Sequence, residues 1–594
     1  MIARRALAVL VGVGLLALIV AAAVASPGVD VVVNDPSLDD AFQNETTLAV
    51  RGSTICAGYN DAGPGGFSGL SRSPDLGATW IDQGGIPQSG DPVLAVHEAT
   101  GTFYYAQLAF LSPGVRTIGV ARSTDGCQTF PAIADASPLS ANADDLQDKP
   151  WIAVDNTGGA RDGDIYVCWT DITDPAILPP PADVRVSRST DGGLTFTDEQ
   201  VVSLPADAIP VGCYVDVGPG GEVYVTWANG DFGAGDFTVR IRRSLDGGLA
   251  WGGAVQVNSA PVRYPGIDRI VVCDPFRPTL NGDIRMTHQT WMAVDTTGGP
   301  FDGRIYVVWQ HDPPGAVDNS DVYFSSSADG GLTWSPQLQV AGGTITDQFE
   351  PFVEVAGDGA VSIAWYDRRN DPANNYNIDV YTTFSTNGGL TLHPLTRLTD
   401  VSFPPITYGC YMGEYIAVAG DASNFYYAWG DNRNSDPDVY FDSVAVPQLK
   451  DPNGDPDNDT LPNVSDPDDD NDGCTDGQEH GPDPNLGGLR DANHFWDFFD
   501  TPDAANVRNK TIDLFIDIFA VAGRFGADDA GGTAVINRNT DPLSAPPASP
   551  AYHPAFDRGG VIGANPWNVA KADGSVDLFN DIFGVANQFG HDCV

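Results

Sequence analysis

Ser189-Thr-Asp191-Gly-Gly193-Leu-Thr195-Phe196 is one of six copies of a short motif that recurs through the first 450 residues. The copies begin at Ser73, Ser123, Ser189, Ser244, Ser327 and Ser385, and their Asp or Asn positions lie 50 to 83 residues apart. Repeats of this period are typical of propellers and solenoids. Ser, Asp and Gly are the residue types that build tight turns, so we expect each copy to be structural.

Two apolar runs recur with the motif and predict the inner strands of each repeat unit. The candidate innermost strands are 47–50, 93–96, 151–154, 214–217, 291–294, 352–355 and 416–419. The candidate second strands, most of which end in an aromatic residue, are 55–59, 103–107, 165–169, 223–227, 305–309, 361–365 and 425–429. Each of the two sets has seven members, which predicts seven repeat units.

The seventh unit lacks the motif and a fourth strand, and the N-terminal residues 29–33 resemble the fourth strands of other units. A strand donated from the N-terminus would close the ring and protect its edges. We therefore predict an all-β fold, a seven-bladed β-propeller over about 29–446, with a six-bladed ring as the alternative. The five Trp residues that recur in register at the ends of second strands should pack between blades.

The pattern S-x-D-x-G-x-T-W resembles the Asp box, or BNR repeat, of the sialidase superfamily. The resemblance implies retaining hydrolysis of sialosides, with three Arg holding the sugar carboxylate, a Tyr nucleophile activated by a Glu, and an Asp acid/base. The family's F/Y-R-I-P motif is absent, since the corresponding region reads Glu45-Thr-Thr-Leu-Ala-Val-Arg51. That absence favours glycan binding without cleavage.

Strand order predicts where a site would lie. In a four-stranded meander the 2–3 loops and the connectors between blades share one face, opposite the Asp boxes. The candidate catalytic residues there are Tyr411 (or Tyr408), Glu414 (or Glu350) and Asp367. The candidate substrate-binding residues are Arg368, Arg369, Arg433, Asp431 and Asp171. The plainer interpretation is that such residues cap strand ends or pair across blades.

The longest connector, about 258–288, lies on the same predicted face and is rich in Arg and Asp, including Arg263, Arg277 and Arg285. Unusually long connectors on a functional face are often lids or specificity loops.

Composition and the N-terminus indicate a secreted protein. The chain has 594 residues, with 79 acidic against 30 basic and a net charge of −49, so nucleic acid is an unfavourable partner. Arg4 and Arg5 precede an apolar run that ends at Ala23-Val-Ala25, which predicts a signal peptide over 1–25, with an uncleaved anchor as the alternative. No other stretch would span a membrane. Eight Cys residues can form disulfides in an oxidising compartment, and their pairing stays open.

Residues 447–482 form an acidic segment that predicts calcium binding. Asp468-x-Asp470-x-Asp472-Gly473-x5-Glu479 fits the calcium-loop pattern in full, with Asp476 at the ninth position. The preceding stretch nearly repeats it with Asp455, Asp457, Asp459 and Asp466, and the pair resembles thrombospondin type 3 repeats. Cys474 lies inside the loop and, with Cys593, is a candidate staple of the tail.

Residues 483–594 contain a second duplication. Residues 513–526 and 577–590 are identical at ten of fourteen positions, and each reads as an amphipathic helix ended by Gly. The duplicated unit resembles a degenerate dockerin, which implies a cohesin-like protein partner. The prediction is therefore a secreted, calcium-stabilised, sialidase-like propeller over 26–446 that binds a glycan or glycoprotein, and the family resemblance implies hydrolysis of a terminal sugar. The alternative is a non-catalytic adhesion or scaffold protein displayed through its tail.

Overall fold

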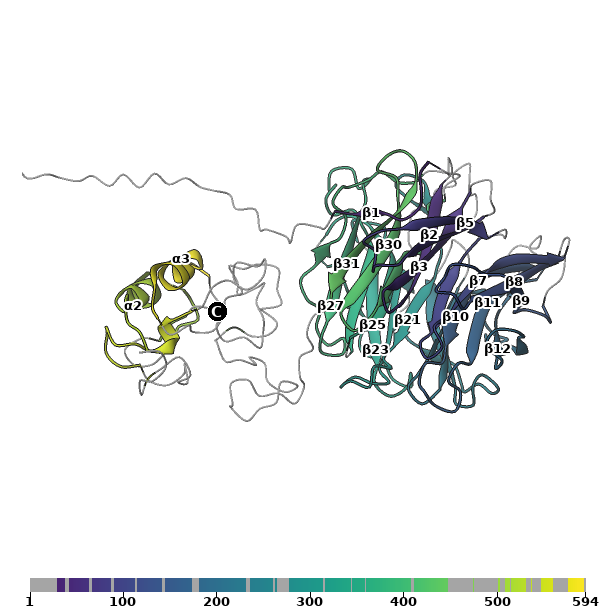
Figure 1. Ribbon diagram of the computed structural model, residues 1–594, viewed down its shortest axis with the longest axis horizontal. Coiled ribbons are helices and arrows are strands. Elements are labelled where there is room, and N and C mark those ends of the chain that lie inside the picture. The colour runs from purple at the N-terminus through teal and green to yellow at the C-terminus, as the bar shows by residue number, and fades with distance from the viewer. Residues whose placement is uncertain are drawn as a thin grey trace, which may run out of the picture.

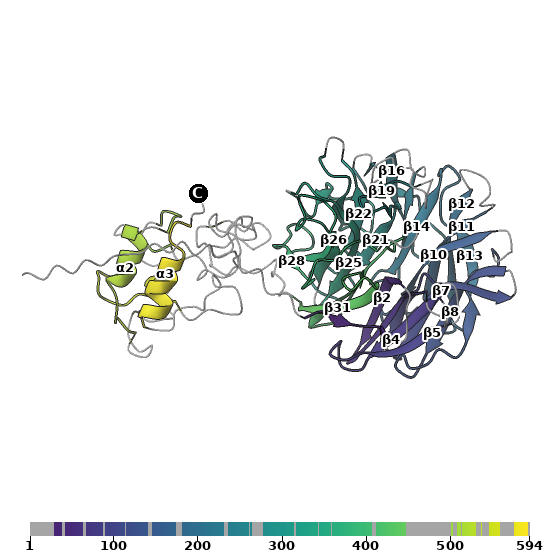
Figure 2. The ribbon, with the colours of Figure 1, turned by 90° about the horizontal axis from the view of Figure 1, so that it is seen from above.

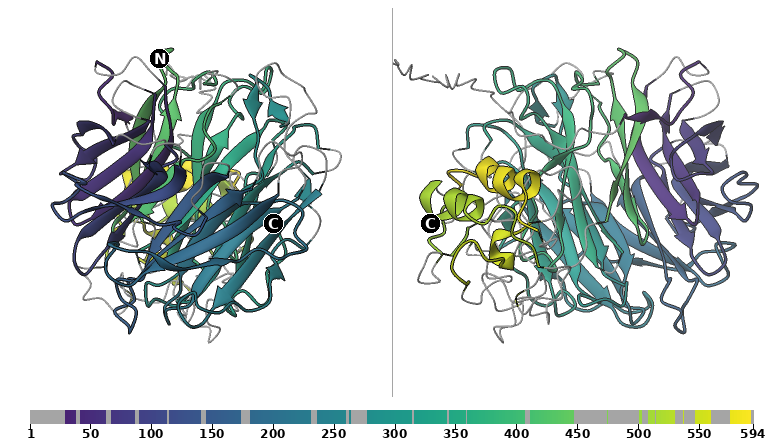
Figure 3. Two further views of the ribbon diagram at one scale, coloured as in Figure 1. Left: turned by 90° about the vertical axis from the view of Figure 1, so that its right-hand side faces the viewer. Right: turned by 60° about the vertical axis from the view of Figure 1, so that its left-hand side comes forward.

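The computed structural model contains seven antiparallel blade sheets that fan out around one axis, six with four strands and one with five (Figure 1; Figure 3, left). This confirms the predicted seven-bladed propeller, and the six-bladed alternative was wrong. The structure describes residues 29–37, 42–62, 67–86, 90–112, 115–140, 145–173, 181–230, 236–259, 262–263, 277–313, 316–342, 344–357, 359–406, 411–446, 474, 500–502, 508–512, 514–529, 536, 546–558 and 575–591.

In blades 1 to 6 the strands run in chain order from the axis outward. Blade 1 consists of β2 (Gln43–Arg51), β3 (Thr54–Asp61), β4 (Ser68–Ser73) and β5 (Ile81–Ile86). Blade 2 consists of β6 (Val93–His97), β7 (Thr102–Ser112), β8 (Val115–Ser123) and β9 (Ile133–Asp135). Blade 3 consists of β10 (Leu146–Val154), β11 (Ile165–Ile172), β12 (Ala182–Ser189) and β13 (Thr197–Val201).

Blade 4 consists of β14 (Pro210–Val217), β15 (Val223–Asn229), β16 (Asp236–Ser244) and β17 (Val255–Gln256). Blade 5 consists of β21 (Thr290–Val294), β22 (Ile305–His311), β23 (Asp321–Ser327) and β24 (Leu338–Gln339). Blade 6 consists of β25 (Gln348–Ala356), β26 (Ala360–Asp367), β27 (Asp379–Ser385) and β28 (Thr396–Arg397). The connector from blade 4 to blade 5 adds β18 (Val262–Arg263), which pairs with β16, and the hairpin β19 (Thr279–Leu280)–β20 (Ile284–Arg285).

Blade 7 joins the two ends of the propeller. It contains β29 (Ala417–Gly420), β30 (Asn424–Asp431) and β31 (Asp438–Ala445), and its outer strand is the N-terminal β1 (Val31–Val32). Val31 and Val32 pair with Phe441 and Tyr440, and the Val33 N–H donates to the Val439 carbonyl at 2.9 Å. In Figure 2, β31 lies beside β2 of the first blade. The predicted closure by residues 29–33 is therefore confirmed.

Each Asp box is a hydrogen-bonded turn between the third and fourth strands. Ser189 Oγ donates to Asp191 Oδ1 at 2.8 Å and accepts from the Gly193 N–H at 2.9 Å. Thr195 donates its N–H to Asp191 Oδ1 and its hydroxyl to Oδ2, at 2.9 and 2.6 Å. Gly193 has a φ of 79°, a conformation that favours glycine. The same four bonds form in the boxes that begin at Ser73 and Ser327.

The blades pack through large aromatic side chains, and two disulfides between described residues link neighbouring blades. The Trp residues predicted to lie between blades are fully buried: Trp169, Trp227, Trp309, Trp365 and Trp429. Cys56 of β3 bonds to Cys127 in the second Asp box, and Cys168 of β11 bonds to Cys213 of β14. Blade 1 is thus linked to blade 2, and blade 3 to blade 4.

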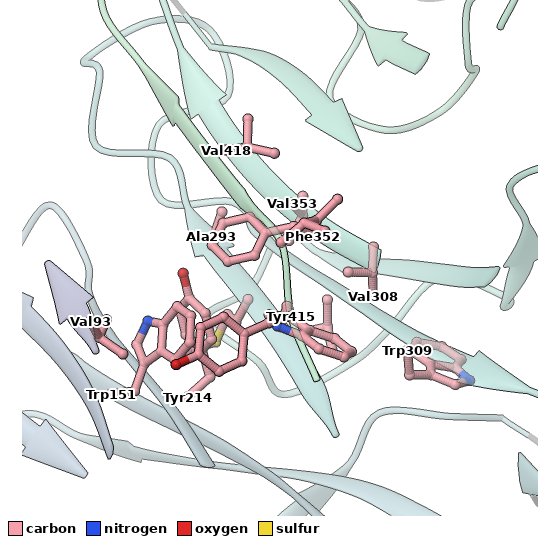
Figure 4. Packing of buried hydrophobic residues seen from close by; sticks show 14 of the residues in the cluster. Val93, Trp151, Tyr214, Ala293, Val308, Trp309, Phe352, Val353, Tyr415 and Val418 are labelled. Atoms are coloured by element: carbon pink, nitrogen blue, oxygen red, sulfur yellow. The ribbon is translucent and has the colours of Figure 1, made fainter. Parts of the chain in front are cut away.

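Aromatic rings from different blades meet among the innermost strands, and we call them the aromatic floor (Figure 4). Trp151 stacks on Tyr214 with ring centroids 4.4 Å apart, and it contacts Phe352 and Tyr415 at 5.8 and 5.7 Å. On the Asp-box side of this floor, the innermost strands surround a cavity of about 270 Å³. On the other side lie the 2–3 loops and the inter-blade connectors, which we call the mouth.

The C-terminal tail contains two short helical segments with pseudo-twofold pairing. Each begins as π-helix and continues as α-helix: η2 (Leu514–Ile518) and α2 (Phe519–Ala522), then η4 (Leu578–Ile582) and α3 (Phe583–Asn587), with a 3-10 turn, η3 (Pro554–Phe556), between them. Gly526 N–H donates to Val576 O, and Gly590 N–H donates to Ile512 O, each at 2.9 Å. The two copies therefore exchange equivalent bonds and pack on one small core.

Several predicted features lie outside the described residues. They are the signal peptide over 1–25, Tyr408, Cys593 and every predicted calcium ligand except Cys474. Cys474 is buried and disulfide-bonded. Within the part of the chain that the structure describes, no helix combines the length and the apolar character that a bilayer crossing requires.

Candidate functional site

The mouth is built on one backbone position that recurs on the innermost strands. Glu45, Asp91, Lys149 and Glu350 have φ values of 51°, 51°, 51° and 49°. Glu45, Lys149 and Glu350 lie in bulges of β2, β10 and β25, and Asp91 lies two residues before β6. Side chains other than Gly rarely adopt a positive φ, and such strain gathers at functional sites. Four charged residues in this conformation are therefore the first indication of a site.

Lys149 joins three blades at the mouth. Its ammonium lies 2.6 Å from Glu45 Oε1, 2.7 Å from Glu414 Oε2 and 3.7 Å from Asp91 Oδ2. Burial disfavours the charged ammonium, but the surrounding carboxylates outweigh burial and raise the pKa of Lys149 well above its usual value. The lysine therefore stays charged and holds blades 1, 2 and 7 around one nitrogen.

The blade 4–5 connector places two arginines on Glu414. Arg277 Nη1 lies 2.6 Å and Arg285 Nη2 lies 3.2 Å from Glu414 Oε1, which also accepts a hydrogen bond from the Thr287 hydroxyl at 2.7 Å. Burial disfavours the carboxylate, but the three cations outweigh it and hold the pKa of Glu414 well below its usual value. Glu414 is therefore an ionised, fully neutralised group.

Tyr411 belongs to the same cluster. The Arg285 guanidinium lies over its ring, 4.3 Å from the centroid, and its hydroxyl accepts from Asn60 Nδ2 at 3.3 Å. Asn60 also donates to Glu45 Oε2 at 2.9 Å. Burial, followed by Glu45 and other neighbouring carboxylates, raises the pKa of Tyr411 well above its usual value. The structure thus brings together the predicted Tyr411 and Glu414, with Arg285 in contact with both.

Glu350 is the group at the mouth without a partner. Only 2% of the residue is exposed, and neither carboxyl oxygen has a hydrogen-bond partner among the described residues. Burial is the largest cause that raises the pKa of Glu350 well above its usual value, and Glu414 and Glu45 add to it. Burial therefore favours the protonated form of Glu350, whereas the cations favour the ionised form of Glu414. Oppositely shifted carboxyl groups in one site suit acid–base chemistry.

Two predicted Asp–Arg pairs occupy equivalent places in blades 6 and 7, away from this cluster. Asp367 accepts from Trp365 Nε1 at 2.7 Å and pairs with Arg369 at 2.6 Å. The same three groups recur at the end of β30, where Asp431 accepts from Trp429 Nε1 at 3.2 Å and pairs with Arg433 at 2.7 Å. A repeated arrangement of this kind caps a strand end.

The remaining predicted ligands also have partners within the propeller. Arg368 is fully buried and donates to Asp347 at 3.1 Å and to the Asn281 carbonyl at 2.7 Å. Asp171 pairs with Arg185 and accepts from Gln147 at 2.8 Å. Among the described residues no hydrogen bond or ion pair joins these side chains, or Asp367, to Tyr411. Their roles toward a sugar stay predictions.

Sequence reasoning named Glu350 as the alternative to Glu414, but it did not single out Lys149, Glu45 or Asp91 as site residues. A signal for the shared position was present: Asp91, Lys149 and Glu350 are each followed by Pro directly before an apolar innermost strand. Arg277 and Arg285, which pair with Glu414, come from a connector whose path no local sequence pattern determines.

No metal centre is apparent in the described ranges, where no group of three or more His, Cys, Asp or Glu residues has a suitable arrangement. This says nothing of the predicted calcium ligands, since only Cys474 of that set is described.

The fold and site define a seven-bladed propeller with a charged mouth, and solved propellers resemble it weakly. No known protein family matches the sequence, and no curated protein is detectably similar. A Dyadobacter fermentans protein of unknown function is 15% identical over 60% of this chain and 98% of its own, with a TM-score of 0.38.

Two glycoside hydrolases are among the other matches. The GH93 α-L-arabinofuranosidase of Fusarium graminearum is 13% identical over 71% of this chain and 98% of its own, with a TM-score of 0.39. The Trypanosoma rangeli sialidase is 10% identical over 69% of this chain and 58% of its own, with a TM-score of 0.37. At these values the matches concern the arrangement of blades and say nothing of this chain's chemistry.

Proposed function

We propose that the mouth binds an extracellular glycan and that the protein hydrolyses its terminal sugar, with Glu350 as the general acid. The observation that supports this proposal is the contrast between two buried carboxyl groups in one cluster. Glu350 has no hydrogen-bond partner among the described residues and a raised pKa, whereas three cations lower the pKa of Glu414. Glycoside hydrolysis needs one protonated and one ionised carboxyl group beside the scissile bond.

The other cluster residues have roles that follow from their charges. The protonated Glu350 would give its proton to the leaving oxygen as the glycosidic bond breaks. The carboxylates of Glu414 and Glu45 would stabilise the positive charge that develops on the sugar ring. Tyr411 remains the candidate nucleophile. Because its pKa is raised, its attack requires transfer of the phenolic proton to a neighbouring carboxylate.

The test is sugar release from glycans and from nitrophenyl glycosides, compared between the wild type and Glu350→Gln. We expect the variant to lose about 10²–10⁴-fold in rate on glycans. The loss should be smaller on nitrophenyl glycosides, whose leaving group needs little protonation. Glu354→Gln is a matched control, because Glu354 lies on the same strand but lines the cavity beyond the aromatic floor. Equal losses on both substrate types would contradict the role of Glu350.

A second candidate function, a scaffold displayed through the tail, is favoured by repeated exposed apolar side chains. Their exposed fractions are similar at equivalent positions of the two copies: Leu514 39% and Leu578 40%, Phe519 55% and Phe583 49%, Phe525 60% and Phe589 58%. Exposed apolar patches often mark protein-binding surfaces. This proposal is tested by binding of the full chain to a panel of cohesin domains, with Phe525→Ser/Phe589→Ser as the variant expected to lose binding.

Calcium binding by Asp468 to Glu479 remains a proposal from the sequence alone. Calcium prefers several carboxylate oxygens, and the loop offers Asp468, Asp470, Asp472 and Glu479. Calorimetric titration of the chelator-treated protein should show binding that Asp470→Asn and Glu479→Gln weaken. Heat identical to that of buffer alone would contradict the proposal.

A further inference from the structure

We propose that the sugar bound at the mouth is uncharged, and this inference rests on the proposed function. The family that the Asp boxes resemble acts on a sugar carboxylate, for which several arginines must be available. At this mouth the cations are already held by carboxylates of the protein itself. The site can therefore favour an uncharged sugar over an anionic one.

Glu414 occupies the place that an anionic ligand would need. It lies 2.6 Å from Arg277, 3.2 Å from Arg285 and 2.7 Å from Lys149. Thr287 adds a hydrogen bond at 2.7 Å. A sugar carboxylate would have to displace this buried, neutralised group to reach the same cations. Displacement would leave a carboxylate buried without its cations, which is strongly unfavourable.

The arginines of the 2–3 loops are committed in the same way. Arg368 lies 3.1 Å from Asp347, and Arg369 lies 2.6 Å from Asp367. Arg433 contacts Asp30 at 2.6 Å and Asp431 at 2.7 Å, and it also pairs with Asp400. Each of these three guanidinium groups therefore already has its own carboxylate partner.

The cluster also carries more acid than base. Its acidic groups are Glu45, Asp91, Asp148, Glu350 and Glu414, and its basic groups are Lys149, Arg277 and Arg285. A carboxylate ligand would place a further negative charge close to the ionised Glu414. Sugar hydroxyls suit the site better, because carboxylate oxygens accept hydrogen bonds and hydroxyl groups donate them. Both oxygens of Glu350 lack hydrogen-bond partners within the described residues.

The experiment measures binding of matched sugar pairs by titration calorimetry. The pairs are methyl glycosides of neutral hexoses and their uronic acids, together with methyl sialoside, and the proteins are the full-length wild type and Glu350→Gln. We expect the neutral member of at least one pair to bind at least about tenfold more tightly than its uronic acid. Tighter binding of a uronic acid or sialoside would overturn this inference and leave glycan binding standing. No binding of either class would overturn the proposed function, and this inference with it.

A second variant tests the cause. Glu414→Gln removes the internal carboxylate and releases three cations, so we expect at least about tenfold tighter binding of the uronic acid. Asp164→Asn is the control, because Asp164 pairs with Arg188 outside the cluster and the variant should keep the wild-type preference. Unchanged uronic acid binding by a folded Glu414→Gln variant would contradict the role of Glu414. If that variant fails to fold, Arg277→Gln/Arg285→Gln must keep the neutral preference.

Discussion

On the Asp-box face, most turns carry the same side chains in the same hydrogen bonds, whereas at the mouth the residue at one backbone position changes from blade to blade. Asp191 and Asp329 each accept from a Thr hydroxyl at 2.6 Å. By contrast, Glu45, Lys149 and Gly212 occupy equivalent bulges on innermost strands. A feature that every blade needs is repeated, and a feature that the molecule needs once is not. In a repeat protein, variation at a fixed position is the stronger indication of a site.

The largest loss of stability should come from replacing Lys149 at the mouth. Lys149→Met leaves three buried carboxylates without their shared cation, so we expect a loss of about 3–5 kcal/mol in the free energy of unfolding. Urea unfolding measures it. The double variant Lys149→Met/Glu414→Gln should recover part of the loss, because it removes both ends of one ion pair. A loss below about 1 kcal/mol for the single variant would mean that water, and not Lys149, neutralises the cluster.

The next largest loss of stability should come from disrupting the N-terminal strand that closes blade 7. Val33→Pro removes the N–H that donates to Val439, at a residue that is 1% exposed. We expect a loss of about 3 kcal/mol, measured by thermal and urea unfolding. Val29→Pro is the control, since Val29 is 84% exposed and precedes the strand. Equal stabilities of the two variants would show that the closure bond contributes little.

Breaking a single Asp box should cost less. Asp191→Ala removes the acceptor of two Thr195 bonds, and we expect a loss of about 1–2 kcal/mol. Asp191→Asn should be milder, because Asn387 already fills this position in the sixth box, where it accepts from Thr391 N–H and donates to its hydroxyl. Chemical unfolding of both variants measures the difference. Identical losses would mean that the geometry of the turn does not depend on these bonds.

The smallest effect is the pH dependence of the boxes. Burial opposes ionisation of Asp191, but hydrogen bonds from Thr195 and Ser189 outweigh it and lower the pKa to about 2. Because this folded value lies below the unfolded one, the stabilisation is complete above about pH 4 and is lost as pH falls toward 2. The stability gap between wild type and Asp191→Asn should therefore narrow from pH 7 to pH 2.5. A gap that stays constant would contradict the lowered pKa.

The sequence allowed the ring to be predicted because its signals are local and repeated. The boxes, the aromatic second strands and the donated residues 29–33 each needed only a few neighbouring positions. The mouth was predicted in part. Tyr411 and Glu414 were placed on it, but their partner Arg285 reaches them from the hairpin of a long connector. A positive φ at Glu350 turns its carboxyl group in a direction that alternation along a strand does not give.

The aromatic floor separates the two faces of the propeller. Trp151 contacts Tyr214, Phe352 and Tyr415, so these rings lie between the mouth and the cavity on the Asp-box side. The mouth and this cavity therefore present separate surfaces, one lined by charged side chains and the other by the innermost strands.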